Sequence, residues 1–162
     1  MLSAALIAVI AVPQRAANVP SKPMPAYQSF VQNWNDEAKP VLAAYMTMED
    51  HWFHVMSPAA IMAKEQRFAP DPGFFAKNGV LLVARVVPDG TPDLKFQSLS
   101  ERGGTLEFKY QYTPAKKPGS FNYTTFIGRE VTKKAGWTKV RFIENGKVVS
   151  EIDVKGGFFR NP

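Results

Sequence analysis

Both histidines of the chain lie in one short segment, MTMEDHWFHVM at residues 46–56, together with three of the six methionines. Imidazole and thioether groups suit copper, and imidazole with carboxylate suits several other divalent metals. His51 and His54 are three residues apart, a spacing at which two side chains on a helix share a face. The segment therefore raises the hypothesis of a metal site at His51 and His54, completed by ligands from elsewhere in the chain.

A second interpretation of the same segment follows from its apolar spacing. Intervals of three and four residues separate the members of a predicted helical stripe, which are Val41, Tyr45, Met48, Trp52 and Val55. On such a helix the methionines and histidines point to different sides, so one ion cannot collect all of them. We predict that Met48, Trp52 and Val55 are core residues and that the histidines with Asp50 lie on a solvated flank. No metal or other cofactor is then expected, and the site at His51 and His54 remains the alternative.

Other kinds of catalytic chemistry have little support in the sequence. The chain contains no cysteine, which excludes disulfides, thiolate nucleophiles and zinc ribbons. It has no Gly-x-Ser-x-Gly elbow for a serine nucleophile. A hydrolase with a carboxylate pair is a further alternative, because glutamates on neighbouring strands could meet; the candidates are Glu107, Glu130, Glu144 and Glu151. We predict no catalytic residue and expect a protein that is not an enzyme.

The elements that would position these residues change in character near residue 70. Helical spacing predicts a helical segment over residues 27–68, and the breaker cluster at residues 69–73 ends it. Alternating or continuously apolar runs then predict strands, at 79–87, 94–100, 105–112 and 121–131, followed by a hairpin over 137–154. We predict one α+β domain over residues 27–162, with the helical segment packed on an antiparallel, sandwich-like sheet of about six strands at residues 79–155.

The final hairpin is the most specific local prediction. Asn145-Gly146 is a favoured two-residue turn, because both positions need a positive φ. This turn would pair Glu144 with Lys147 and Phe142 with Val149. Apolar residues then occur on both faces, so we expect the hairpin to be covered on both sides.

The N-terminus predicts export. Residues 2–12 form an apolar run that matches the apolar region of a secretory signal and is too short to cross a bilayer, so no transmembrane span is expected. We assign residues 1–17 to a signal peptide and the proline-rich residues 18–26 to an extended tether. The alternative is that the apolar run is a buried strand or helix of the fold. The expected location is periplasmic or extracellular.

The net charge of +6 indicates the kind of partner to expect. Residues 1–102 are balanced in charge, so the excess lies in residues 103–162. A basic field attracts anionic partners, and no recognised reading motif accompanies it, so nucleic acid is not the expected partner. We predict partner contacts in and around the proline-bounded loop 113–120 and in the later basic pair, at Tyr112, Lys116, Lys117, Phe121, Tyr123, Lys133 and Lys134. The alternative is that the lysines keep a loop soluble and the aromatic rings are core.

Residues 71–134 resemble a known family in layout. The stretch runs from DPGFFAKNGVLLVARVV through LKFQSLSERGGTLEFKYQYTP to KKPGSFNYTTFIGREVTK, and it is similar to the C-terminal domain of the bacterial protease-complex subunit family called PrcB. The chain has Asp89-Gly90-Thr91-Pro92 where that family has a Gly-Gly-aromatic turn. The resemblance implies a small exported β domain that acts through protein contacts. We therefore predict a non-enzymatic binding or accessory domain that contacts a protein or an acidic polymer of the cell envelope.

Overall fold

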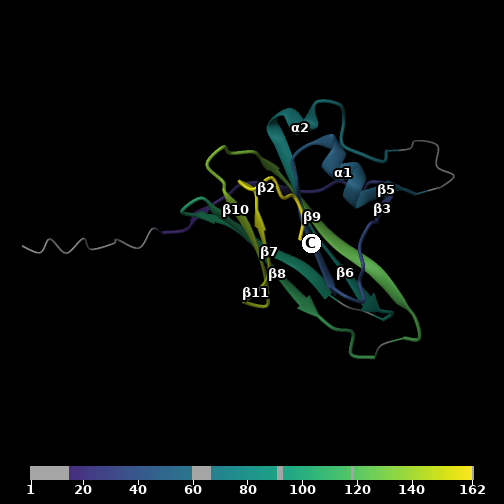
Figure 1. Ribbon diagram of the computed structural model, residues 1–162. Coiled ribbons are helices and arrows are strands. Elements are labelled where there is room, and N and C mark those ends of the chain that lie inside the picture. The colour runs from purple at the N-terminus through teal and green to yellow at the C-terminus, as the bar shows by residue number, and fades with distance from the viewer. Residues whose placement is uncertain (1–14, 60–66, 91–92, 118, 162) are drawn as a thin grey trace, which may run out of the picture.

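The computed structural model of the chain describes residues 15–59, 67–90, 93–117 and 119–161. Most of these residues lie in strands, and the two helices are short: α1 at Glu49–Val55 and α2 at Phe74–Lys77. The predicted β region is confirmed. It forms a β-sandwich, with α1 and α2 at one end (Figure 1).

Three sheets are present in the described part of the chain. The first has the order β1-β7-β8-β10-β11, with β1 at Ala17–Asn18, β7 at Asp93–Arg102, β8 at Thr105–Thr113, β10 at Lys139–Glu144 and β11 at Lys147–Asp153. The second has the order β2-β9-β6-β4, with β2 at Ser21–Pro23, β9 at Asn122–Thr132, β6 at Asn78–Pro88 and β4 at Val41–Met46. A small third sheet pairs β3 at Ser29–Val31 with β5 at Met56–Pro58. Pairing is antiparallel except between β8 and β10, which are parallel, so the prediction of about six antiparallel strands was too simple.

The main core lies between the first two sheets. The strand predicted at residues 105–112 is β8, and its alternation directs Leu106, Phe108 and Tyr110 inward, where all three are buried. From the other side, alternate residues of β4 and β6 pack against them, such as Tyr45 and Leu81. The two facing sheets thus bury one apolar layer, which is the basis of the sandwich.

A second core covers the outer face of the four-stranded sheet and corrects the helical prediction. Every residue of β4 is buried. The side chains of β4 that face away from the main core pack under Trp52 and Val55 of α1; these are Leu42, Ala44 and Met46. The predicted helical segment over residues 27–68 is wrong for its described part: residues 27–59 contain strands and one helix, α1, of seven residues. Residues 60–66 of the predicted segment lie outside the described residues. Trp52 and Val55 are core as predicted, whereas Met48, expected in the core, is 49% exposed.

The hairpin turn is confirmed, with φ of 50° at Asn145 and 82° at Gly146. Its register differs from the prediction, because Val149 is an extra residue in β11 and Phe142 pairs with Ser150. Ser150 is therefore buried, while Val148 and Val149 are exposed. The expectation that both faces of the hairpin are covered was wrong.

The N-terminal segment lies along two sheet edges. β1 pairs with β7, and β2 pairs with β9 near its C-terminal end. Residues expected as a tether thus supply edge pairing, extended by hydrogen bonds from Val19 N–H to Leu99 O and from Met24 N–H to Gly128 O. Most of the predicted signal peptide, residues 1–14, lies outside the described residues. Among the described helices, none has the length and apolar character that crossing a membrane requires.

Candidate functional site

The loop between β8 and β9 forms the end of the sandwich opposite α1 and α2 (Figure 1). Asp89 anchors it: the Asp89 N–H donates to Phe121 O at 2.7 Å, and the Asp89 O accepts from Gly119 N–H. Gly90, at φ 143°, packs so closely that a Cβ there would lie 2.8 Å from the Ala115 Cβ. The loop is therefore held against the turn after β6, and that contact requires glycine.

Two lysines and two aromatic rings are displayed at this end. Lys116 and Lys117 are exposed, and no ion pair to either occurs in the described part of the chain. Phe121 is 60% exposed and Tyr123 is 38% exposed. Apolar rings next to unpaired cations provide contact area and charge on one surface. We call these four residues the basic-aromatic end.

Tyr112 is placed differently from its predicted companions. The Arg85 guanidinium lies 4.1 Å from the centre of the Tyr112 ring, a cation–π contact that covers it. Arg85 also donates two hydrogen bonds to Glu144, at 2.9 and 3.2 Å. Tyr112 is therefore half-buried against Arg85 and is not part of the exposed basic-aromatic end. The sequence did not predict that Arg85 pairs with Glu144, because the two residues are 59 positions apart and no motif joins them.

Lys133 and Lys134 lie at the other end of β9, beside α2, and are not part of this surface. The Lys133 ammonium donates to the backbone oxygens of Phe75 and Thr47. Lys134 forms an ion pair with Glu101 at 2.7 Å. Hydrogen bonds from Lys134 and Trp137 lower the pKa of Glu101 below its usual range. The structure thus divides the seven predicted residues: Lys133 and Lys134 each have partners within the chain, and the Lys134 side chain is still 60% exposed.

The two histidines flank one aromatic ring. The His51 ring stacks on Phe159 with centroids 4.0 Å apart, and the His54 ring meets the same phenyl edge-on at 5.4 Å. His51 Nδ1 also lies 3.3 Å from the Thr47 N–H, which donates to it. His51 is partly buried, not on the solvated flank we expected. No cluster of three or more potential metal ligands from His, Cys, Asp and Glu occurs in the described residues.

The four glutamates of the carboxylate hypothesis lie on three surfaces. Glu107 and Glu151 share the outer face of the five-stranded sheet, where both contact Arg141, at 3.7 and 2.8 Å. Hydrogen bonds from Lys139 and Arg141 lower the pKa of Glu151, the opposite of what a general acid requires. Glu144 faces inward to Arg85, and Glu130 lies on the second sheet, where burial raises its pKa. The structure therefore does not bring the four glutamates together in one cleft.

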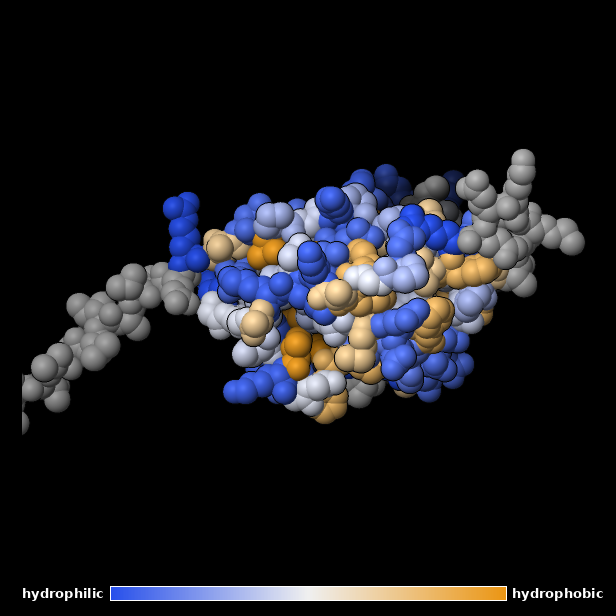
Figure 2. Space-filling model, turned by 90° about the horizontal axis from the view of Figure 1, so that it is seen from above, coloured by the Kyte–Doolittle hydropathy of each residue, from blue (hydrophilic) through white to orange (hydrophobic). Residues whose placement is uncertain are grey.

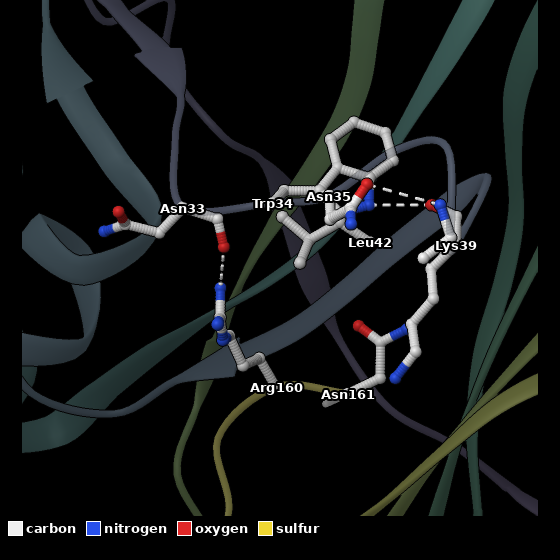
Figure 3. A pocket seen from close by; sticks show the side chains of 8 residues that line it. Asn33, Trp34, Asn35, Lys39, Leu42, Arg160 and Asn161 are labelled. Carbon is white, nitrogen blue, oxygen red and sulfur yellow. Dashed lines mark hydrogen bonds between the residues drawn. The ribbon is translucent and has the colours of Figure 1, made fainter.

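A cavity of about 230 Å³ lies beside the C-terminal residues (Figure 3). Its polar groups largely bind one another: Trp34 Nε1 donates to Lys39 O at 2.8 Å, and Arg160 donates to Asn33 O. Asn161 accepts from Ala43 N–H through Oδ1 and donates to Val41 O through Nδ2. These contacts hold residues 159–161 against β4, where Ala44 and Arg160 form an isolated antiparallel bridge, so the cavity borders a structural junction. We call residues 159–161 the C-terminal clasp.

Hydrophobic residues at the α1 and α2 end are scattered. Figure 2 views the molecule from that end, and its hydrophobic side chains form small patches separated by hydrophilic ones. Such a surface does not suggest a large apolar interface on that face.

Comparison with family models, with curated proteins and with solved structures gave no match for this chain. The resemblance of residues 71–134 to PrcB therefore stays a prediction, and the function is argued from the geometry alone.

Proposed function

We propose that the protein is a non-enzymatic binding module that docks an acidic partner through its basic-aromatic end. The observation that carries this proposal is the contrast among the predicted lysines. Lys133 is held by hydrogen bonds to the backbone oxygens of Phe75 and Thr47, and Lys134 is paired with Glu101. In contrast, Lys116 and Lys117 are exposed in the loop before Phe121 and have no ion pair in the described residues. Unpaired cations on an anchored loop are available to an external anion without losing an internal contact.

Binding to fluorescein-labelled poly-glutamate, followed by anisotropy, tests the proposal. We expect binding at about 25 mM salt that weakens strongly by about 200 mM, because exposed charges are screened over shorter distances as salt rises. The double variant Lys116→Glu/Lys117→Glu should lose at least about tenfold in affinity.

The matched control is Lys77→Glu/Lys155→Glu, which makes the same change in net charge at the opposite end of the sandwich. Both lysines are exposed there. We expect the affinity of the control to lie within about twofold of the wild type, a small loss that reflects the change in net charge alone. Equal losses in the two double variants, or binding that is indifferent to salt, would contradict the proposal.

We also propose that the protein is exported, on the basis of the apolar run at residues 2–12. Ala17 of β1 pairs with Glu101 of β7. Removal of residues 1–17, the boundary predicted from the sequence, would delete half of β1, so we propose an earlier cut, before Ala17. The intact mass of the protein recovered from the periplasm or medium measures the site. Recovery of the full-length chain from the cytoplasm alone would contradict export.

A further inference from the structure

Most edges of the long strands in the described residues carry a protective device. Residues 159–161 cover β4. β7 is paired with β1 at one end, has an extra residue at Gln97, and carries Asp93 and Lys95 at the other end. β11 has the extra residue Val149 and several charged residues. Covering strands, bulges and charges are the usual means by which proteins prevent unwanted pairing at sheet edges.

The N-terminal half of β9 lacks all of these devices. β2 covers β9 at Arg129–Val131, and Met24 extends the cover to Gly128. Over residues 122–126 no further strand pairs on this side in the described chain. The sequence there, NYTTF, has neither charge nor proline, and the register with β6 runs without a shift from Asn78 to Pro88. This stretch is a regular, uncharged edge of high β propensity.

The backbone groups that face outward can be assigned from the pairing. Gly128 O accepts from Met24, so the even-numbered residues of β9 direct their N–H and C=O groups away from β6. Because the strand is regular, Asn122, Thr124 and Phe126 do the same. These residues span about 13 Å, enough for about five residues of an added strand.

The surroundings favour an acidic strand. Lys116 and Lys117 belong to the loop that leads directly into β9, and Phe121 and Tyr123 stand exposed at its start. An extended peptide paired with Asn122–Phe126 would place one of its ends next to these cations and rings. Backbone pairing supplies affinity without sequence preference, and the flanking side chains select the charge.

We propose that the outer edge of β9 from Asn122 to Phe126 binds an extended acidic peptide segment as an added β-strand. This inference rests on the proposed function and specifies its partner as a polypeptide. A non-peptide polyanion could use Lys116 and Lys117 but has no alternating N–H and C=O groups to pair with the edge.

The test uses a labelled ten-residue peptide of alternating glutamate and valine, with binding measured by anisotropy on the full chain. Thr124→Pro removes one outward N–H and puts a ring on the edge, and it leaves the hydrogen bonds to β6 intact because the Thr124 N–H does not face β6. We expect Thr124→Pro to weaken binding at least about tenfold and Thr124→Val to change it less than about twofold. Circular dichroism and the urea midpoint verify that both variants remain folded.

A second arm changes only the probe. Methylation of alternate backbone nitrogens of the peptide on one edge should abolish binding, and replacement of glutamate by lysine should weaken it at least about tenfold. Amide signals of Asn122, Thr124 and Phe126 should shift and gain exchange protection on binding. This arm stays informative even if Thr124→Pro perturbs the fold.

The outcomes separate this inference from the proposed function. Binding that depends on Lys116 and Lys117 but tolerates both Thr124→Pro and peptide methylation would overturn strand addition and leave an anionic partner of another kind. Binding that none of these changes affects would overturn both. Concentration-dependent dimerisation of the wild type that Thr124→Pro abolishes would overturn the peptide assignment, because a second copy of the chain would then occupy the edge.

Discussion

The two outer edges of the four-stranded sheet differ in how far their backbone groups are paired. Along β4, the C-terminal clasp supplies backbone partners for Ala43 and Tyr45, and Asn161 adds two side-chain hydrogen bonds. Along β9, cover ends at Gly128 and an uncharged stretch remains open. One sheet thus has a closed edge built for stability and a half-open edge next to its unpaired cations. The strand addition proposed above depends on this difference, since only the β9 edge leaves backbone groups open to a peptide.

Removal of the clasp should have the largest effect. Truncation after Phe158 deletes the partners of Ala43 and Tyr45, the Asn161 contacts and the ring that packs on His51. We expect a loss of about 3 kcal/mol in the free energy of unfolding, measured by urea denaturation. A newly exposed β4 edge should also promote self-association, visible in sedimentation. Unchanged stability would show that the clasp does not close this edge in solution.

Amide hydrogen exchange should separate the two edges directly. The Tyr45 N–H is bonded to Phe159 O at 2.7 Å, whereas the Thr124 N–H faces outward from β9. We expect exchange at Thr124 to be faster than at Tyr45 by about a hundredfold, with Thr125 slow because it faces β6. Equal protection of Thr124 and Thr125 in the isolated protein would mean that the β9 edge is already covered.

Loss of a single side chain of the clasp should reduce the free energy of unfolding more than loss of its counterpart on the open edge. Asn161→Ala removes the hydrogen bonds to Ala43 N–H and Val41 O, so we expect a loss of about 1–2 kcal/mol in thermal or urea unfolding. Asn122→Ala is the matched control on β9 and should cost less than about 0.5 kcal/mol. Equal costs at the two positions would remove the asymmetry.

The smallest effect concerns pH. Burial against Phe159 lowers the pKa of His51 from its ordinary value of 6.5, with the Asp50 charge opposing and His54 adding to the shift. The unfolded chain therefore binds a proton on His51 at higher pH than the folded chain. The contribution of neutral His51 to the free energy of unfolding is fully present above about pH 6.5 and is lost as the pH falls through the lowered pKa of the folded state.

The His51→Gln variant isolates this contribution. Between about pH 6.5 and 5 the free energy of unfolding of the wild type should fall more than that of the variant. Amide hydrogen exchange at the β9 edge should change only as the intrinsic exchange rate changes with pH. Parallel pH profiles for the two proteins would exclude His51 as the source of the pH dependence.

Local patterns predicted much of the β region for a physical reason. Residues 105–112 alternate because one face of β8 is core and the other is solvent, and Asn145-Gly146 forms its turn because both φ angles are positive. The helical prediction around β4 was wrong because a strand buried on both faces has no alternation of apolar and polar residues. Its apolar residues also match helical intervals, and periodicity alone cannot distinguish the two.

The candidate site was predictable only where its residues are neighbours in sequence. Lys116, Lys117 and Phe121 share one loop, so their proximity was visible. Lys133 and Lys134 look identical to the first pair in sequence, but the fold brings Glu101 and the Phe75 carbonyl to them. Whether a surface lysine is paired depends on residues tens of positions away, which no local pattern contains.

The sequence by itself determined the β-rich class, the final turn and the concentration of positive charge in the C-terminal strands, since these depend on side-chain period, backbone φ and composition. Tertiary structure alone decided which lysines have partners within the chain, that residues 159–161 close β4, and that Asn122–Phe126 stays open in the described structure. The reason is that edge pairing and ion pairing join segments distant along the chain, and the strand order that brings them together comes from burying two apolar layers at once.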